Sequence, residues 1–145
     1  MSIKHLLILW TLLALPFYMN AQQDTSANAD KSWVKYEGNP VLGNSELGTC
    51  FGVDVIAEGQ SRDNMYFSWR PKKAIALSRS EDGIHWSDPA IVLEYDESSG
   101  WEDNLNRSCT LYWNGQYHMW YTGQYLPGKK EGNSYIFYAV SEDGA

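Results

Sequence analysis

The sequence predicts an all-β fold built from a repeated unit. Short apolar and aromatic runs alternate with turn residues from position 52 onward, and no stretch has the roughly 3.6-residue period of an amphipathic helix. The segment Ser-Glu-Asp-Gly occurs at 80–83 and again at 141–144, and similar strand-like runs precede both copies in the same order. Such internal similarity is typical of repeated β-architectures.

The first residues have the pattern of a secretory signal peptide. Lys4 precedes an apolar stretch at 6–17, and Ala21 supplies a small residue before polar Gln22. The alternative is a transmembrane anchor, but this stretch is shorter than the roughly 20 residues that a spanning helix needs. We therefore expect a signal peptide at 1–21, cleavage after Ala21, and a secreted or periplasmic protein. The polar residues 22–32 are expected to form a disordered leader, with order beginning at Trp33.

Seven strands are expected after this leader. Their expected ranges are 52–57, 64–69, 74–80, 90–94, 109–113, 117–122 and 135–141. Turns are expected at 81–83, 113–116 and 142–144. The pair Asn114-Gly115 lies between two aromatic-rich runs and is the strongest hairpin signal in the chain.

The repeat favours a β-propeller over a β-sandwich. The two Ser-Glu-Asp-Gly segments are 61 positions apart, and an aromatic second strand belongs to each unit. A sandwich also has alternating strands, but it has no reason to repeat its turn chemistry. Propellers close with about four to eight blades, and residues 33–145 hold about two. We therefore expect an incomplete propeller domain, the N-terminal fragment of a longer protein.

The charge and the cysteine and histidine content limit which partners, disulfides and metal sites we expect. The net charge of −7 argues against binding of nucleic acid and against a polybasic membrane contact. Cys50 and Cys109 could pair in an oxidising compartment, or each could be a buried free thiol in an apolar run. His85 and His118 lack partners at metal-ligand spacing. No metal and no cofactor is expected, and the sequence leaves the oligomeric state open.

Three segments carry a resemblance to a known group of enzymes. The run Ser-Glu-Asp-Gly-Ile-His-Trp at 80–86 is one residue shorter than the Asp-box of sialidases and resembles the Ser-x-Asp-Gly-x-x-Trp turn of five-bladed propeller glycosidases. Residues 33–42 and the run Tyr-His-Met-Trp-Tyr-Thr-Gly at 117–123 are also similar to segments of those enzymes. The group includes glycoside hydrolase families 43, 32, 62, 68, 117 and 130, and the resemblance covers Trp33 to Gly144.

The resemblance implies where a sugar would bind. In these enzymes the first strand of each blade presents a carboxylate to a central pocket, and Asp54 would be the nucleophile or general base. The alternative is a structural acid hydrogen-bonded across the channel. Arg107 matches an arginine of the second blade, whereas Ser108 and Cys109 stand where Asp and Pro are common.

Other side chains could complete such a site. Glu102 or Asp103 could replace the missing carboxylate, or they could belong to an ordinary surface turn. Trp101 and Trp69 are candidate platforms for stacking a sugar ring, and Trp120 is expected to lie in the core. The expected function is an exported glycoside hydrolase of family 43 type acting on poly- or oligosaccharides, inactive as a fragment. The alternatives are a non-catalytic carbohydrate-binding propeller and a mannoside phosphorylase of family 130 type.

Overall fold

The computed structural model describes residues 33–59, 61–125 and 133–145. The predicted signal peptide and leader at 1–32 lie outside the described residues. Trp33 and Val34 belong to a separate N-terminal unit, and everything below concerns the compact unit Lys35–Ala145. No helix in the described part of the chain is long and apolar enough to cross a membrane.

The fold is all-β, as predicted, and the seven described strands match the seven expected ones. Their bounds are β1 Cys50–Ala57, β2 Asp63–Trp69, β3 Ala74–Ser80, β4 Ala90–Leu93, β5 Asn104–Trp113, β6 Gln116–Gln124 and β7 Ser134–Ser141. A single turn of 3₁₀-helix, η1 Arg70–Lys72, joins β2 to β3. The largest difference is at β5, which begins five residues earlier than predicted because the segment from Asn104 to Asn106 pairs with the end of β6.

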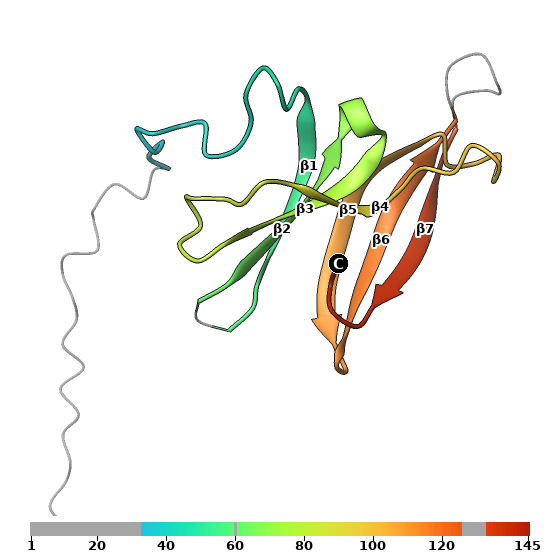
Figure 1. Ribbon diagram of the computed structural model, residues 1–145. Helices are drawn as coiled ribbons and strands as arrows, with labels where there is room; N and C mark the ends of the chain where they lie inside the picture. Colours follow the sequence, from blue (N-terminus) through green and yellow to red (C-terminus); the bar gives the residue numbers. More distant parts are fainter. Residues whose placement is uncertain (1–32, 60, 126–132) are drawn as a thin grey trace, which may run out of the picture. The chain divides into compact units, whose positions relative to one another are not determined.

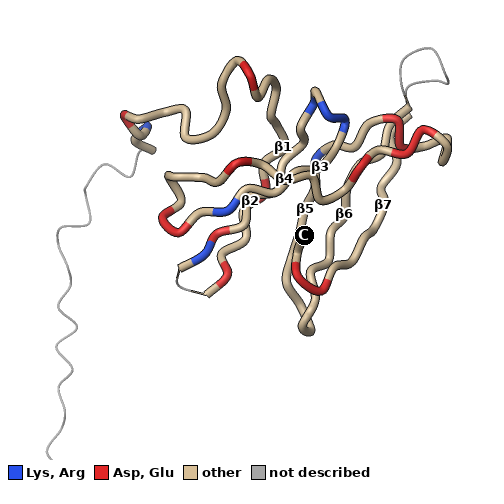
Figure 2. The backbone as a smooth tube through the Cα atoms, viewed as in Figure 1, with Lys and Arg blue, Asp and Glu red and all other residues tan. Residues whose placement is uncertain are grey.

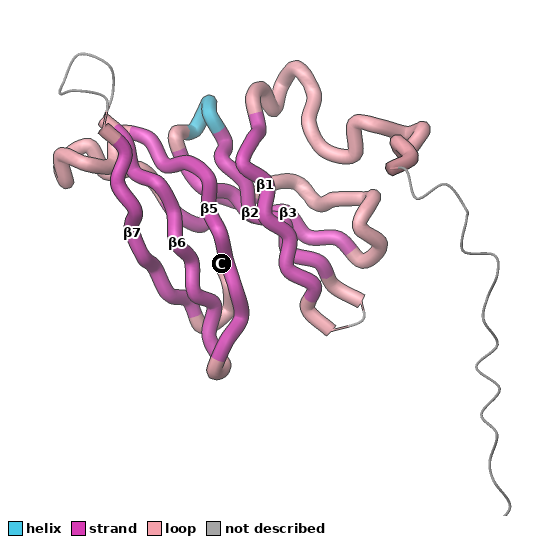
Figure 3. Tube along the Cα trace, turned by 180° about the vertical axis from the view of Figure 1, so that it is seen from behind, coloured by secondary structure: helices cyan, strands magenta, loops and turns pink. Residues whose placement is uncertain are grey.

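The strands form two antiparallel sheets that repeat one topology. The first sheet has the order β1-β2-β3-β4, and the second has the order β5-β6-β7 (Figure 1). Of the second sheet, β5 lies nearest the first sheet and contacts β1, β2 and β3 (Figure 3). The first strand of each repeated unit therefore lies beside the first strand of the other.

The pairing register fixes which residues of the two units are equivalent. Asp54 pairs with Tyr66, which pairs with Leu77 on the next strand. In the second sheet Cys109 pairs with Trp120, which pairs in turn with Tyr138. Asp54 and Cys109 therefore occupy equivalent positions in the two sheets, and so do Tyr66 and Trp120.

Each first strand contains a β-bulge at the same place. In β1 the register shifts between Phe51 and Asp54, around Gly52 with φ 62°. In β5 it shifts between Asn106 and Cys109, around Arg107 with φ 48°. A bulge adds one unpaired residue and so reverses which face the following side chains occupy. The repeat is therefore structural as well as sequential.

The Ser-Glu-Asp-Gly segments form the same turn twice. The Oγ of Ser80 accepts hydrogen bonds from the backbone N–H groups of Asp82 and Gly83, at 3.2 and 2.9 Å. The Oγ of Ser141 accepts the corresponding bonds from Asp143 and Gly144, at 3.3 and 3.0 Å. Both glycines have positive φ, 73° and 77°, which a residue with a side chain seldom adopts. The predicted turns at 81–83 and 142–144 are confirmed.

The predicted hairpin between β5 and β6 is also confirmed. Trp113 pairs with Gln116, so Asn114 and Gly115 form a two-residue loop. Their φ angles of 52° and 83° are both positive, as a type I′ turn requires.

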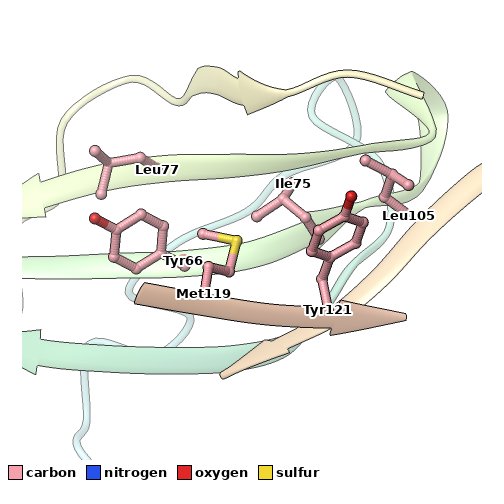
Figure 4. Packing of buried hydrophobic residues seen from close by; sticks show 6 residues of the cluster. All are labelled: Tyr66, Ile75, Leu77, Leu105, Met119 and Tyr121. Carbon is pink, nitrogen blue, oxygen red and sulfur yellow. The ribbon is translucent and has the colours of Figure 1, made fainter. Parts of the chain in front are cut away.

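The main core lies between the two sheets. It consists of Tyr66, Ile75 and Leu77 from the first sheet and Leu105, Met119 and Tyr121 from the second (Figure 4). A smaller cluster lies on the far face of the first sheet, where Met65, Phe67, and Ala76 are covered by side chains that include Leu42, Trp69 and Trp86. The first sheet is thus buried on both faces.

The second sheet has one covered and one open face. Trp120 was predicted to lie in the core, and this prediction is wrong, since its side chain is 41% exposed. Alternation along β6 places Met119 and Tyr121 on the face toward the first sheet and Trp120 on the opposite face. Cys50 and Cys109 are free thiols, partly buried and exposed respectively, so neither the disulfide nor a buried Cys109 is found. The pKa of the Cys50 thiol is raised by its partial burial.

Candidate functional site

Asp54 links the first strands of the two sheets. Its side chain is partly buried in β1, and its Oδ2 accepts a short hydrogen bond from the backbone N–H of Thr110 in β5. A hydrogen bond of this kind, from one first strand to the other, is compatible with the structural role that was the alternative for Asp54. Its other oxygen, Oδ1, has no hydrogen-bond partner among the described residues, which leaves one acceptor atom for a ligand.

Arg107 lies at the bulge in β5, close to Gly52 of β1, which is two residues before Asp54. Its backbone N–H donates to the Oγ of Ser68 at 2.7 Å, which ties the bulge to β2. A Cβ at Gly52 would lie 3.1 Å from the Cα of Arg107, so the lack of a side chain at Gly52 permits this close approach. The Arg107 side chain is exposed and pairs with no carboxylate in the described part of the chain.

Three further cations lie on the turn between β2 and β3 (Figure 2). The guanidinium of Arg70 lies over the ring of Phe51 at 4.9 Å, and Lys72 lies over the ring of Trp69 at 5.6 Å. Lys73 forms an ion pair with Glu97 at 2.9 Å, and its hydrogen bond to the Glu97 carboxylate raises the pKa of Lys73. The backbone N–H of Leu105 donates to the carbonyl of Lys73 at 3.0 Å, so the turn lies against the start of β5.

The loop before β5 holds the two acidic residues that were predicted as replacements. Glu102 is partly buried and accepts a hydrogen bond from the hydroxyl of Tyr121 at 2.7 Å. Burial, followed by this bond, raises the pKa of Tyr121 above its ordinary range. Asp103 is only 1% exposed. The fold therefore uses one oxygen of Glu102 to position Tyr121, and it buries Asp103.

The rings of the two predicted stacking platforms differ in their exposure to solvent. Trp69 is partly buried, and its indole N–H donates to the carbonyl of Leu47 at 2.8 Å. Trp101 is 41% exposed and contacts the rings of Tyr125 and Tyr135, with centroid distances of 5.3 and 4.8 Å. Of the two, Trp101 offers the more accessible ring.

An aromatic row on the open face of the second sheet was missed by the sequence analysis. His118 lies between Trp113, Trp120 and Tyr138, with ring centroids 5.5, 6.5 and 6.0 Å away. Its Nδ1 lies 2.6 Å from the hydroxyl of Tyr138, and its Nε2 lies 3.1 Å from the carbonyl of Trp113. The missed signal was the alternation of His118 and Trp120 along β6, because Trp120 had been predicted to lie in the core.

The Ser-x-Asp-Gly turns hold their aspartates in the charged form. In the first turn, hydrogen bonds from the His85 side chain and from the backbone of His85 and Ile84 lower the pKa of Asp82. In the second, a bond from the backbone N–H of Ala145 and another from Ser141 lower the pKa of Asp143. These carboxylates accept hydrogen bonds within their own turns, which is a structural role.

No protein family model, no curated protein and no solved structure matches this chain. Within the residues described, no three His, Cys, Asp or Glu side chains gather as they would around a metal ion.

Proposed function

We propose that the two sheets are consecutive blades of a β-propeller. The support is the repeated topology, with the same bulge in each first strand and the same turn after each third strand. The two sheets stack in the same orientation, so the face that the first sheet turns toward the second sheet is equivalent to the face that the second sheet leaves open. A propeller would place a further sheet on the open face of β5-β6-β7, where Trp120, Ile136 and Tyr138 are 41%, 72% and 53% exposed.

We further propose that the protein is an exported glycoside hydrolase acting on poly- or oligosaccharides. The observation that carries this proposal is the placement of Asp54 on the first strand of the first blade, with Oδ1 available and Arg107 on the adjacent strand. Asp54 would act as the nucleophile or general base, and Arg107 would donate paired hydrogen bonds to sugar hydroxyls or to a uronate carboxylate.

Glycoside hydrolysis needs a second carboxyl group as the general acid. Among the described first strands only β1 carries a carboxylate, because Cys109 occupies the position in β5 that is equivalent to Asp54. The general acid of this proposal therefore lies elsewhere in the domain.

The test compares Asp54→Asn with Asp88→Asn. Asn keeps the size of Asp54 and removes its charge, and Asp88 is an exposed acid on a loop that serves as the matched control. Release of reducing ends is measured for the complete propeller domain, since a fragment is expected to be inactive, over a panel of aryl glycosides and oligosaccharides, with saccharide binding followed by calorimetry. We expect Asp54→Asn to abolish turnover with unchanged near-ultraviolet circular dichroism. Equal rates for both variants on a substrate that the protein cleaves would remove Asp54 from the mechanism.

A carbohydrate-binding protein without catalysis is the second candidate. Two observations favour it, the lack of a carboxylate in β5 and the exposed ring of Trp101. Saccharide affinity that is retained in Asp54→Asn, with no product from the unmodified protein, would select this candidate.

A mannoside phosphorylase is the third candidate. It is favoured by the cations Arg70, Lys72 and Arg107 at one end of the sheets, because phosphorolysis needs a basic site for inorganic phosphate. Release of a sugar phosphate only when phosphate is added would select it.

A further inference from the structure

Arg70 and Arg107 approach neighbouring residues near the start of β1. The guanidinium of Arg70 lies over the ring of Phe51, 4.9 Å from its centroid. Phe51 is followed by Gly52, where a Cβ would lie 3.1 Å from both the Cα and the Cγ of Arg107. The backbone N–H of Arg107 donates to the hydroxyl of Ser68, the residue that pairs with Phe51. The fold thus brings two arginines from distant parts of the chain to the same end of β1.

Neither arginine has a counter-charge in the described part of the chain. Both side chains are exposed, and none of the ion pairs among the described residues includes them. Carboxylates are not scarce, since the chain has 18 acidic and 11 basic residues, and Lys73 on the same turn does pair with Glu97. Like charges that lie close together repel, and Lys72 adds a further positive charge to this turn. A bound anion would relieve that repulsion.

The repeat shows that the Arg107 side chain is kept at a cost to the backbone. Because Asp54 and Cys109 are equivalent, Arg107 occupies in β5 the bulge position that Gly52 occupies in β1. Both residues have positive φ, 62° at Gly52 and 48° at Arg107. Glycine adopts this conformation readily, whereas a residue with a side chain is strained there, and such strain gathers at ligand sites. Glycine satisfies the bulge in the first unit, so the arginine at 107 has another role.

The chemistry of the two arginines fits a carboxylate. A guanidinium carries five N–H donors and no acceptor, and its planar fork matches the two oxygens of a carboxylate. Asp54 follows Gly52 by two residues, about 7 Å along a strand, so one sugar residue can reach both Asp54 and Arg107. A carboxylate carries one negative charge, so Asp54 repels it less strongly than a phosphate group, which carries about two.

We propose that Arg70 and Arg107 bind the carboxylate of a uronic-acid residue and make this protein selective for acidic saccharides. This inference rests on the proposed function, because it names the substrate class of the site that contains Asp54. Arg107 donates paired hydrogen bonds to the two carboxylate oxygens, and Arg70 supplies a second positive charge and further donors. Both residues act in the selection of the substrate and not in the chemical step.

Calorimetric titration of the complete protein tests this selectivity. The probes are trigalacturonate and an unsulfated chondroitin disaccharide, each compared with its carboxyl methyl ester, which keeps the sugar and removes the charge. We expect at least one acid to bind about tenfold or more tightly than its ester, the effect of a charge-assisted hydrogen bond. This preference is expected to shrink as salt is raised from about 0.05 to about 0.5 M, because ions screen exposed charges.

Three variants assign the preference to the two arginines. Arg107→Gly copies the bulge of the first unit, so we expect it to abolish the preference for the acid while the melting temperature stays the same or rises. A purely structural role of Arg107 would lower the melting temperature instead. Arg70→Gln is expected to weaken binding of the acid about three- to tenfold and to leave the ester unchanged. Arg79→Gln removes an exposed arginine at the other end of β3 and is expected to change neither affinity.

Three results would overturn the proposal. The first is equal affinity for each acid and its ester, or no binding of either acid. The second is a preference that persists in folded Arg107→Gly. The third is inorganic phosphate that binds more tightly than both acids and is lost in the same variants, which would make this a phosphate site. Because affinity is measured, equal binding of acid and ester together with loss of turnover in Asp54→Asn would reject the acidic substrate and leave the proposed hydrolase in place.

Discussion

Replacing Leu105 with Ala tests whether the two sheets share one core. Leu105 is 1% exposed and belongs to the core between the sheets, where it lies beside Tyr121 and near Ile75 of the first sheet (Figure 4). Losing three buried methyl-sized groups at about 0.8 kcal/mol each removes about 2.4 kcal/mol of transfer free energy. The cavity that remains adds to this loss, so we expect the free energy of unfolding to fall by about 3 to 4 kcal/mol. Urea denaturation followed by tryptophan fluorescence measures the change.

The same strand supplies a matched control. Leu111 lies on β5 six positions after Leu105 and is 42% exposed on the open face of the second sheet. We expect Leu111→Ala to change the free energy of unfolding by only about 0.5 kcal/mol. Equal losses at the two positions would refute the packing of the second sheet on the first through Leu105.

Three other predictions concern the turns, a buried tyrosine and the thiols. Ser80→Ala leaves two backbone N–H groups without their acceptor, so the free energy of unfolding measured by urea denaturation is expected to fall by about 1 to 2 kcal/mol. Ser141 is more exposed, and Ser141→Ala is expected to give a smaller loss. No loss for Ser80→Ala would contradict a structural role for this turn. Burial raises the pKa of Tyr66 to about 12 from about 10 in the unfolded chain. The free energy of unfolding is therefore expected to fall as pH rises from about 10 to about 12. In Tyr66→Phe the melting temperature should depend less on pH over this range. Cys109 is exposed and Cys50 is partly buried with a raised pKa, so mass spectrometry should find iodoacetamide on Cys109 first, and equal labelling rates would be inconsistent with this difference in burial.

Local sequence was sufficient to predict the strands and their turns. The aromatic and β-branched runs, the Asn114-Gly115 pair and the two Ser-Glu-Asp-Gly segments each act over a few residues, through φ preferences and short-range hydrogen bonds. The start of β5 was missed because the run from Asn104 to Asn106 has the composition of a loop. These residues become strand only because β6 offers them a partner.

The candidate site was only partly accessible from the sequence. Asp54 stands out because a carboxylate in an apolar strand needs partners, and the hydrogen bond from Thr110 supplies one. The burial of Asp103 and the bond between Tyr121 and Glu102 depend on how the loop before β5 folds over β6. No local sequence pattern distinguishes a buried or hydrogen-bonded carboxylate from an exposed one.

By itself the sequence determined the all-β class, the order of the strands and the repeat, because these follow from local preferences. The tertiary structure decided which side chains lie in the core. Leu105 and Leu111 are an even number of positions apart, and a regular strand would place both on one face. The bulge at Arg107 reverses the alternation, so Leu105 packs into the core while Leu111 lies on the open face. That bulge is fixed by the Ser68 hydroxyl and the close approach of Gly52, contacts that join strands far apart in the chain.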